Sequence, residues 1–277
     1  MSEACDVMLF VCGGGACHVI REHEPSSMPV VMLNPDSPDE DTEAAFRPAA
    51  HAVARAAVEE HAELVSRMRI VFVYAILGGD MGSILVSEVT KYAQEAGCRV
   101  VAVAGIPWEE GTPRRGRALD MLPEVVASAD RTLVSDGLAV AKLMDDNVRT
   151  IDSIVRASGY AMQNALDSLA QLAEGPFFST LPESAYTYSY VKDLDPVRAV
   201  ERAMDATAFP TDPAYGKMTV TVSSAFGRAQ LEEVFEAVVS RTGIIPEIVK
   251  RDDREDTRVL VFLPVRLSPS SPRASRS

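Results

Sequence analysis

Hydrophobic and polar positions alternate in a regular way along the first half of the chain. Continuous apolar runs of strand length predict buried β-strands at residues 6–12, 29–33, 69–77, 98–106 and 131–135. Between them, apolar residues at helical spacing predict helices at residues 16–24, 43–68, 84–96 and 114–127. This alternation predicts a parallel sheet with helices on both faces, in which ligands bind beyond the carboxyl ends of the strands.

The second half of the chain predicts one long helix and then a smaller α/β unit. Residues 147–174 keep helical spacing up to the stop signal Gly175-Pro176. Strands are expected at residues 185–191, 217–224, 244–250 and 257–263, with helices at 196–207 and 228–241. The tail, residues 265–277, is rich in Ser, Pro and Arg and is expected to be disordered.

The charge and the cysteine content exclude several classes of partner. A formal net charge of −13 argues against general affinity for nucleic acid or anionic membranes, so an anionic ligand would have to be bound by backbone amides. No apolar run approaches the roughly 20 residues of a membrane span, and no basic leader precedes the first apolar run, so we expect a cytoplasmic protein. The cysteines lack paired spacing and are expected to be reduced; they are Cys5, Cys12, Cys17 and Cys98.

Two glycine-rich turns follow predicted strands and precede predicted helices. The first is GGGACH at residues 13–18, and the second is GGDMGS at residues 78–83, where Ser83 is expected to cap the next helix. Glycines at a helix N-terminus let backbone amides approach an anion, and two such turns at one sheet edge favour a phosphate chain. Neither turn has the spacing of a dinucleotide fingerprint or of a P-loop.

The turn after the fourth predicted strand carries charged residues. Its sequence is PWEEGTPRR at residues 107–115, in which Glu110 and Arg114 stand four apart. They could reach a ribose or a phosphate, but taken alone they are interpreted as an ordinary exposed ion pair.

The order of elements and these turns resemble the tubulin and FtsZ superfamily. The matching segments are GGGACH (13–18), LNPD (33–36), GGDMGS (78–83) and PWEEGTPRR (107–115), and the resemblance extends from the first strand to about Pro264. It implies an α/β chain with a parallel-sheet, GTPase-like nucleotide-binding domain at residues 1–146 and a long central helix at 147–174. A smaller C-terminal α/β domain at 175–264 and a tail at 265–277 would follow.

The resemblance also implies a ligand, a site and partners. The ligand would be GTP or GDP, with Mg²⁺ if Asp80 holds it. Partners would be further copies of the chain, stacked head to tail or as a dimer, or a related FtsZ-like protein, in a cytoskeletal role such as cell division. The residues implied to contact the nucleotide are Gly13, Gly14, Gly15, Cys17, His18, Asn34, Gly78, Gly79, Asp80, Met81, Gly82, Ser83, Pro107, Glu110, Arg114, Asp136 and Ser158.

Departures from the family pattern weaken the implied pocket. Asp80 replaces a glycine of the phosphate turn, and a carboxylate 4 Å from a phosphate costs a few kcal/mol near a protein surface unless a cation intervenes. We therefore expect lower affinity, or Mg²⁺ at Asp80. Cys17 and His18 stand where the family has asparagines, and Ser158 stands where it has the aspartate that reads guanine, so base selectivity is also in doubt.

The segment after the central helix departs furthest from the family. Relatives carry two acids there, which position the attacking water, whereas this chain has PFFSTLPES with Glu183 as its one acid and sole catalytic candidate. Weak or absent hydrolysis is therefore expected. An alternative is a non-polymerising ligand-binding or regulatory homologue that has lost GTP binding. A Rossmann oxidoreductase with Asp36 at a ribose ranks third, because the first turn lacks its glycine spacing.

Overall fold

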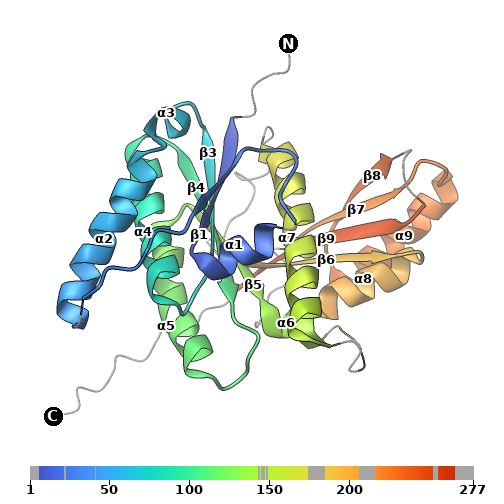
Figure 1. Cartoon of the computed structure of the whole chain (residues 1–277). Helices are drawn as coiled ribbons and strands as arrows, with labels where there is room; N and C mark the ends of the chain where they lie inside the picture. Colours follow the sequence, from blue (N-terminus) through green and yellow to red (C-terminus); the bar gives the residue numbers. More distant parts are fainter. Residues whose placement is uncertain are drawn as a thin grey trace.

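The structure, a computed structural model, contains one sheet of nine strands in its described part. It describes residues 6–265 except 22, 41, 143, 145–146, 148, 174–184, 206–215 and 252–254, so Glu183, Gly175-Pro176 and residues 266–277 lie outside it. The strand order is β2-β1-β3-β4-β5-β6-β9-β7-β8 (Figure 1). The strands are β1 (Val7–Cys12), β2 (Val30–Leu33), β3 (Ile70–Ile76), β4 (Arg99–Ile106), β5 (Arg131–Asp136), β6 (Ala185–Asp193), β7 (Lys217–Ser223), β8 (Glu247–Arg251) and β9 (Thr257–Pro264).

The sheet confirms the α/β class and the parallel first half. Strands β1 to β6 pair in parallel, β9 runs antiparallel to both β6 and β7, and β7 pairs in parallel with β8. The sheet is continuous past the predicted domain boundary at residue 175, and the division into domains remains a prediction.

Helices cover both faces of the sheet (Figure 1). The described helices are α1 (Gly14–Arg21), α2 (Glu43–Glu59), α3 (Ala62–Val65), α4 (Asp80–Glu95), α5 (Pro113–Ser128), α6 (Gly137–Lys142), α7 (Ile151–Ala173), α8 (Pro196–Asp205) and α9 (Arg228–Thr242). One hydrophobic core lies under α2, α4 and α5, a second under α1 and α7 on the opposite face, and a third joins α8 and α9 to the C-terminal strands. None of the described helices is long and apolar enough to cross a membrane.

Several predicted helix boundaries were wrong, for local reasons. The expected helix at 43–68 is two helices, because the chain bends at His61, whose ring packs edge-on against Phe10 at 5.9 Å. The long helix begins at Ile151 rather than 147, because the Thr150 side chain accepts a hydrogen bond from the Ser153 amide (3.1 Å), as an N-cap does. Helix α6 was not predicted at all, since its six residues are too short to show a helical period.

Strand β8 also starts later than expected. It begins at Glu247 rather than residue 244, directly after Pro246, which has no amide hydrogen for a strand ladder. Ile244 is nevertheless buried in the third core, which explains why the apolar pattern extended the prediction.

Candidate functional site

The carboxyl ends of the parallel strands meet along one edge of the sheet. Cys12 at the end of β1 is in register with Leu33 of β2 and Ala75 of β3. Further along, Ile76 is in register with Gly105, and Ile106 with Asp136. The turns after β1, β2, β3, β4 and β5 are therefore neighbours, which is the arrangement that ligand sites of such sheets use.

The two glycine turns touch each other. Gly13 has φ +83°, and a Cβ at this position would lie 2.9 Å from the Cα of Gly82. Such a contact is closer than real Cβ atoms tolerate, and L-residues rarely adopt this backbone conformation. Only glycine therefore fits at Gly13, and the main-chain convergence expected from the sequence is present.

Two further residues lie close to the first glycine turn. A Cβ at Gly14 would be 3.4 Å from the side-chain oxygen of Asn34, which follows β2. A Cβ at Gly15 would be 3.5 Å from Nη2 of Arg114, which comes from α5. The turn thus presents an amide side chain and a guanidinium group beside its own backbone.

Helices α1 and α4 both begin at these turns. Helix α1 starts at Gly14, and α4 starts at Asp80 with Gly79 in extended conformation before it. The first-turn amides of an α-helix have no partner within the helix, and the helix dipole places partial positive charge there. Two such helix starts, in contact through their glycines and next to a guanidinium group, make a cradle suited to a phosphate chain.

Helix α5 fixes the second glycine turn. Arg117 donates from Nε and Nη2 to the carbonyl oxygen of Gly78, at 3.2 and 3.0 Å. Gly78 has φ +83°, and a Cβ there would lie 2.2 Å from the carbonyl oxygen of Arg114. The turn therefore depends on the first two turns of α5 for its position.

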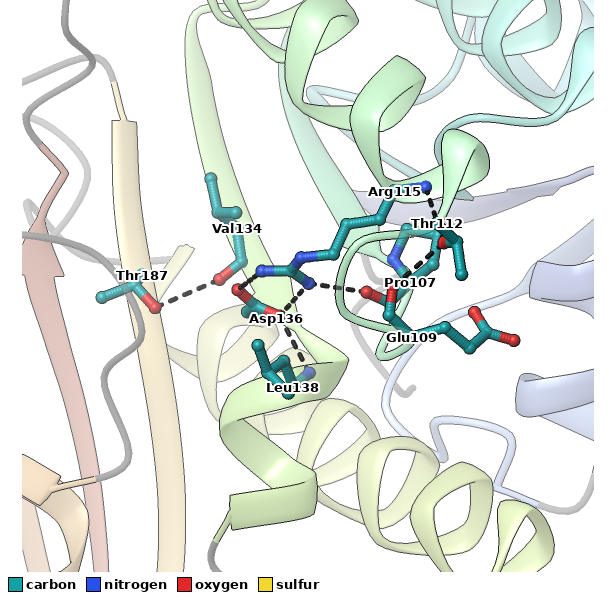
Figure 2. Close-up of polar contacts among 8 residues, drawn as sticks. All are labelled: Pro107, Glu109, Thr112, Arg115, Val134, Asp136, Leu138 and Thr187. Carbon is teal, nitrogen blue, oxygen red and sulfur yellow. Dashed lines mark hydrogen bonds and ion pairs between the residues drawn. The ribbon is translucent and has the colours of Figure 1, made fainter.

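A buried ion pair anchors α5 in turn to the end of β5 (Figure 2). Arg115 donates from Nη1 to Asp136 Oδ1 and from Nη2 to Oδ2, each at 2.7 Å, and also from Nη1 to the Pro107 carbonyl at 2.6 Å. The side chains are only 12% and 1% exposed, and the Leu138 amide donates to Asp136 Oδ1 at 2.8 Å. The hydrogen-bonded carboxylate raises the pKa of Arg115 above its usual range. Asp136 is thus fully engaged with protein groups.

The N-terminus of α5 is capped just beside this pair (Figure 2). The Thr112 hydroxyl accepts a hydrogen bond from the Arg115 amide at 3.3 Å and donates to the Glu109 carbonyl at 3.0 Å. The cap and the ion pair together define the loop after β4 that carries Pro107 and Glu110.

Asp80 occupies the first position of α4 and is exposed. A carboxylate at a helix N-terminus is favoured by the helix dipole, so Asp80 stabilises the start of α4. Within the described ranges, no cluster of three or more His, Cys, Asp or Glu side chains forms a metal site.

Three of the expected site residues are buried: Cys17, Met81 and Ser83. The Met81 side chain is 8% exposed within the first core, and the Cys17 thiol is buried and donates to the Val11 carbonyl at 3.6 Å. Ser83 does not cap α4, because it already lies in the first turn of the helix and donates from Oγ to the Gly79 carbonyl at 3.0 Å. Cys17 and His18 lie on α1, and of the two only His18 is exposed.

Helices α1 and α7 pack closely next to Ser158. A Cβ at Gly159 would be 2.6 Å from Cδ2 of His23 and 3.0 Å from the Val19 carbonyl oxygen. Ser158, the preceding residue, is half-buried. The missing side chain of Gly159 therefore lets the two helices approach at the level of the predicted base contact.

Sequence reasoning missed the roles of Arg115 and Arg117. It chose Arg114 and paired it with Glu110, whereas the ion pair observed in this loop joins Arg115 to Asp136. The sequence Arg-Arg-Gly-Arg directly after the cap Thr112 and the first helical residue Pro113 was the available signal, because consecutive arginines on a helix point in different directions.

Comparisons with known proteins agree with this arrangement at the level of fold. No family model matches the chain, and no curated protein matches it. An empty FtsZ dimer of M. jannaschii aligns with a TM-score of 0.74 and 17% identity, over 93% of this chain and 87% of that chain. CetZ1 of Haloferax volcanii, a GDP-bound monomer, aligns with a TM-score of 0.70 and 14% identity, over 95% of this chain and 94% of that chain. TubZ of Bacillus thuringiensis serovar israelensis, in GDP-form protofilaments, aligns with a TM-score of 0.61 and 12% identity, over 95% of this chain and 86% of that chain.

The chain has the tubulin/FtsZ fold. The alignments span nearly the whole chain, so this fold includes the C-terminal strands as well as the glycine-turn half. The tubulin/FtsZ fold therefore accounts for the element order that the sequence predicted, although sequence identity is below 20% in each comparison.

Proposed function

We propose that this protein is a tubulin/FtsZ-type cytoskeletal or assembly protein with a divergent guanine-nucleotide pocket and weak or absent GTP hydrolysis. The contact between the two glycine turns carries the proposal: Gly13 meets Gly82 where α1 and α4 begin, with Arg114 beside Gly15. The neighbours support it, because CetZ1 is a GDP-bound monomer in one structure and TubZ forms GDP-form protofilaments in another.

Each part of the site has a distinct task in this proposal. The first-turn amides of α1 and α4 bind the phosphate oxygens, and Arg114 neutralises part of their charge. Arg117 and the Arg115–Asp136 pair do not touch the ligand; they keep α5 and the second turn in place.

Mg²⁺ fits this site in one specific manner. Magnesium in nucleotide sites commonly binds one or two carboxylates together with phosphate oxygens, and Asp80 supplies one exposed carboxylate at the turn. When bound, the ion would offset the repulsion between Asp80 and a phosphate. Without it, the carboxylate weakens binding of the anion.

Calorimetry and thermal denaturation with GTP, GDP and ATP, each with and without Mg²⁺, test the proposal. We expect guanine nucleotides to raise the melting temperature, with release of phosphate from GTP slow or undetectable, and sedimentation to report assembly. Arg114→Ala should remove the response to nucleotide, whereas Gly116→Ala, where nothing lies within 4 Å of the added Cβ, should keep it. If no nucleotide binds to the folded wild-type chain, the nucleotide proposal fails.

A second candidate function rests on Asp80. The exposed carboxylate at the start of α4 favours a non-polymerising binding or regulatory protein that has lost the nucleotide. This alternative predicts no sedimentation at any nucleotide concentration. It also predicts that Asp80→Gly does not create a thermal response to GTP.

A further inference from the structure

A cavity lies beside Asp136, at the end of β5. It measures about 250 Å³ and is enclosed by the end of β5, helices α6 and α7, and β6. Much of its wall is apolar, with contributions from Ala139, Val140, Met144, Ala157, Ala161 and Val191. Its size is just below the roughly 300–1,000 Å³ of pockets for drug-sized ligands, so a small molecule fits.

The cavity exists because the sheet opens between β5 and β6. Among the described residues, these strands are in register over Thr132–Val134 and Ala185–Thr187. Strand β6 then continues to Asp193, and its described ladder beyond Thr187 is with β9. Helices α6 and α7 cover the opening, so the space is a consequence of the fold rather than of one side chain.

A buried hydroxyl group lies in the cavity wall. Tyr188 is 7% exposed, and its hydroxyl oxygen makes no hydrogen bond of ordinary geometry within the described residues. Burial raises the pKa of Tyr188 to about 12, although a hydrogen bond with the Ser135 side chain acts in the opposite direction. A ligand carboxylate would offer this hydroxyl a charged acceptor, which forms a stronger hydrogen bond than a neutral hydroxyl does.

Charged groups in the wall favour an anion. Lys192, with a side chain 51% exposed, pairs with Asp256 at 3.1 Å. Arg202, with a side chain 44% exposed, pairs with Asp193 at 3.2 Å. Partly exposed pairs of this kind are weak, so both cations still attract a carboxylate. Asp136, the acid in the wall, is already neutralised by Arg115.

Aromatic rings in the cavity wall favour a ligand that itself contains an aromatic ring. Tyr160 and Tyr190 both line the cavity, with ring centroids 5.9 Å apart in an edge-on arrangement. Aromatic partners pack favourably against such rings. We propose that this cavity is a binding site for a small aromatic carboxylate, with its ring among the tyrosines and alanines and its carboxylate toward Tyr188, Lys192 and Arg202.

Titration calorimetry with 4-phenylbutyrate and 4-phenylbutylamine tests the charge preference on the full chain. The two probes share the same ring and linker, so only the charged end differs. We expect the acid to bind and the amine to bind at least tenfold more weakly. Equal affinity for the two probes, or no binding of either, overturns the proposal.

Variants locate the binding within the cavity. Tyr188→Phe should weaken the acid about 3–10-fold by removing one hydrogen bond while keeping the shape of the side chain. Arg202→Ala should weaken it, whereas Arg198→Ala should not, since Arg198 pairs with the same Asp193 but does not line the cavity. Ala161→Phe should abolish binding by filling the space.

Circular dichroism checks that each variant folds. If Ala161→Phe does not fold, the near-isosteric Tyr188→Phe and the matched arginine pair decide the question. Wild-type affinity in a folded Ala161→Phe, or equal loss in Arg198→Ala and Arg202→Ala, would place the probe elsewhere and contradict the proposal.

Discussion

The two glycine turns meet at one point but are held in different ways. The first turn is fixed by the sheet itself, because the Gly13 amide donates to the Leu33 carbonyl of β2 at 2.8 Å. The second turn is fixed by side chains of α5, since Arg117 binds the Gly78 carbonyl at two points. The first turn carries no acid, whereas the second begins its helix with Asp80.

The first turn is therefore held by the sheet, whereas the position of the second turn depends on α5. Movement of α5 would shift the second turn and leave the first in place. The ion pair between Arg115 and Asp136 is therefore the element on which the geometry of the second turn depends. Substitutions in and around the second turn should have progressively smaller effects, and a substitution at Asp193, outside both turns, should have the smallest.

Asp136→Ala should have the largest effect. It leaves the Arg115 guanidinium, 12% exposed, without its carboxylate, and we expect the free energy of unfolding to fall by about 3–5 kcal/mol. Chemical denaturation measures this loss. The double variant Arg115→Leu/Asp136→Leu should recover much of it, and a double variant as unstable as the single one would show that the unpaired charge is not the cause.

Gly78→Ala should follow, with a loss of about 2–4 kcal/mol from the left-handed backbone conformation and the clash with α5. The added Cβ would lie 2.2 Å from the Arg114 carbonyl oxygen, which is backbone and cannot rotate away. Gly116→Ala in the same helix is the control, and it should stabilise by about 0.5–1 kcal/mol. Similar melting temperatures for the two variants would contradict the described packing.

Arg117→Ala should reduce stability by only about 1 kcal/mol, because its hydrogen bonds to the Gly78 carbonyl lie near the surface. Arg114→Ala provides the contrast. We expect Arg117→Ala to lower the melting temperature in the absence of ligand, and Arg114→Ala to reduce the response to nucleotide instead. If Arg114→Ala instead lowers the melting temperature without ligand and Arg117→Ala reduces the response to nucleotide, the roles assigned to the two arginines are wrong.

Asp80→Asn tests the acid of the second turn directly. If a phosphate lies about 4 Å from this carboxylate, removal of the negative charge should tighten nucleotide binding at least fivefold in the absence of Mg²⁺. Addition of Mg²⁺ should reduce this advantage if Asp80 holds the ion. Calorimetry at fixed ionic strength measures both affinities, and weaker binding in the variant would identify Asp80 as a required ligand.

Asp193, far from both turns, should give the smallest effect and one that depends on pH. Its carboxylate accepts from the Asp195 amide and pairs with Arg202 and Arg198, which lowers its pKa below the usual value near 3.8 despite the opposing effect of burial. Because the folded-state pKa is depressed, its contribution is complete above pH 3.8 and is lost as the pH falls through the folded value. Asp193→Asn should therefore have a lower free energy of unfolding than the wild type at pH 5, and the difference between the two should be smaller at pH 2.5. Chemical denaturation at both pH values measures this difference.

Much of the sheet could be predicted from the sequence, because buried parallel strands are continuous apolar runs. The predicted strand at 98–106 and the observed β4 (Arg99–Ile106) differ by one residue. The meeting of the glycine turns also followed from topology alone. The start of α4 at Asp80 was missed because Gly82 and Ser83 lie within its first turn and resemble loop residues.

The side-chain contacts of the site could not be predicted in the same way. Which of three nearby arginines faces β5 depends on the exact start of α5, and Asp136 comes to Arg115 only through the pairing of β4 with β5. Helical period gives the face of a residue only once the boundaries are known. The cavity beside α7 was equally out of reach, since it arises from the length of a strand pairing.

The short pairing between β5 and β6 also has a mechanical consequence. In the part of the chain that the structure describes, three residue pairs join β5 to β6, against eight between β6 and β9. A tensile load applied perpendicular to the strands would separate β5 from β6 first. Under such a load the chain would therefore yield within the subunit, between β5 and β6.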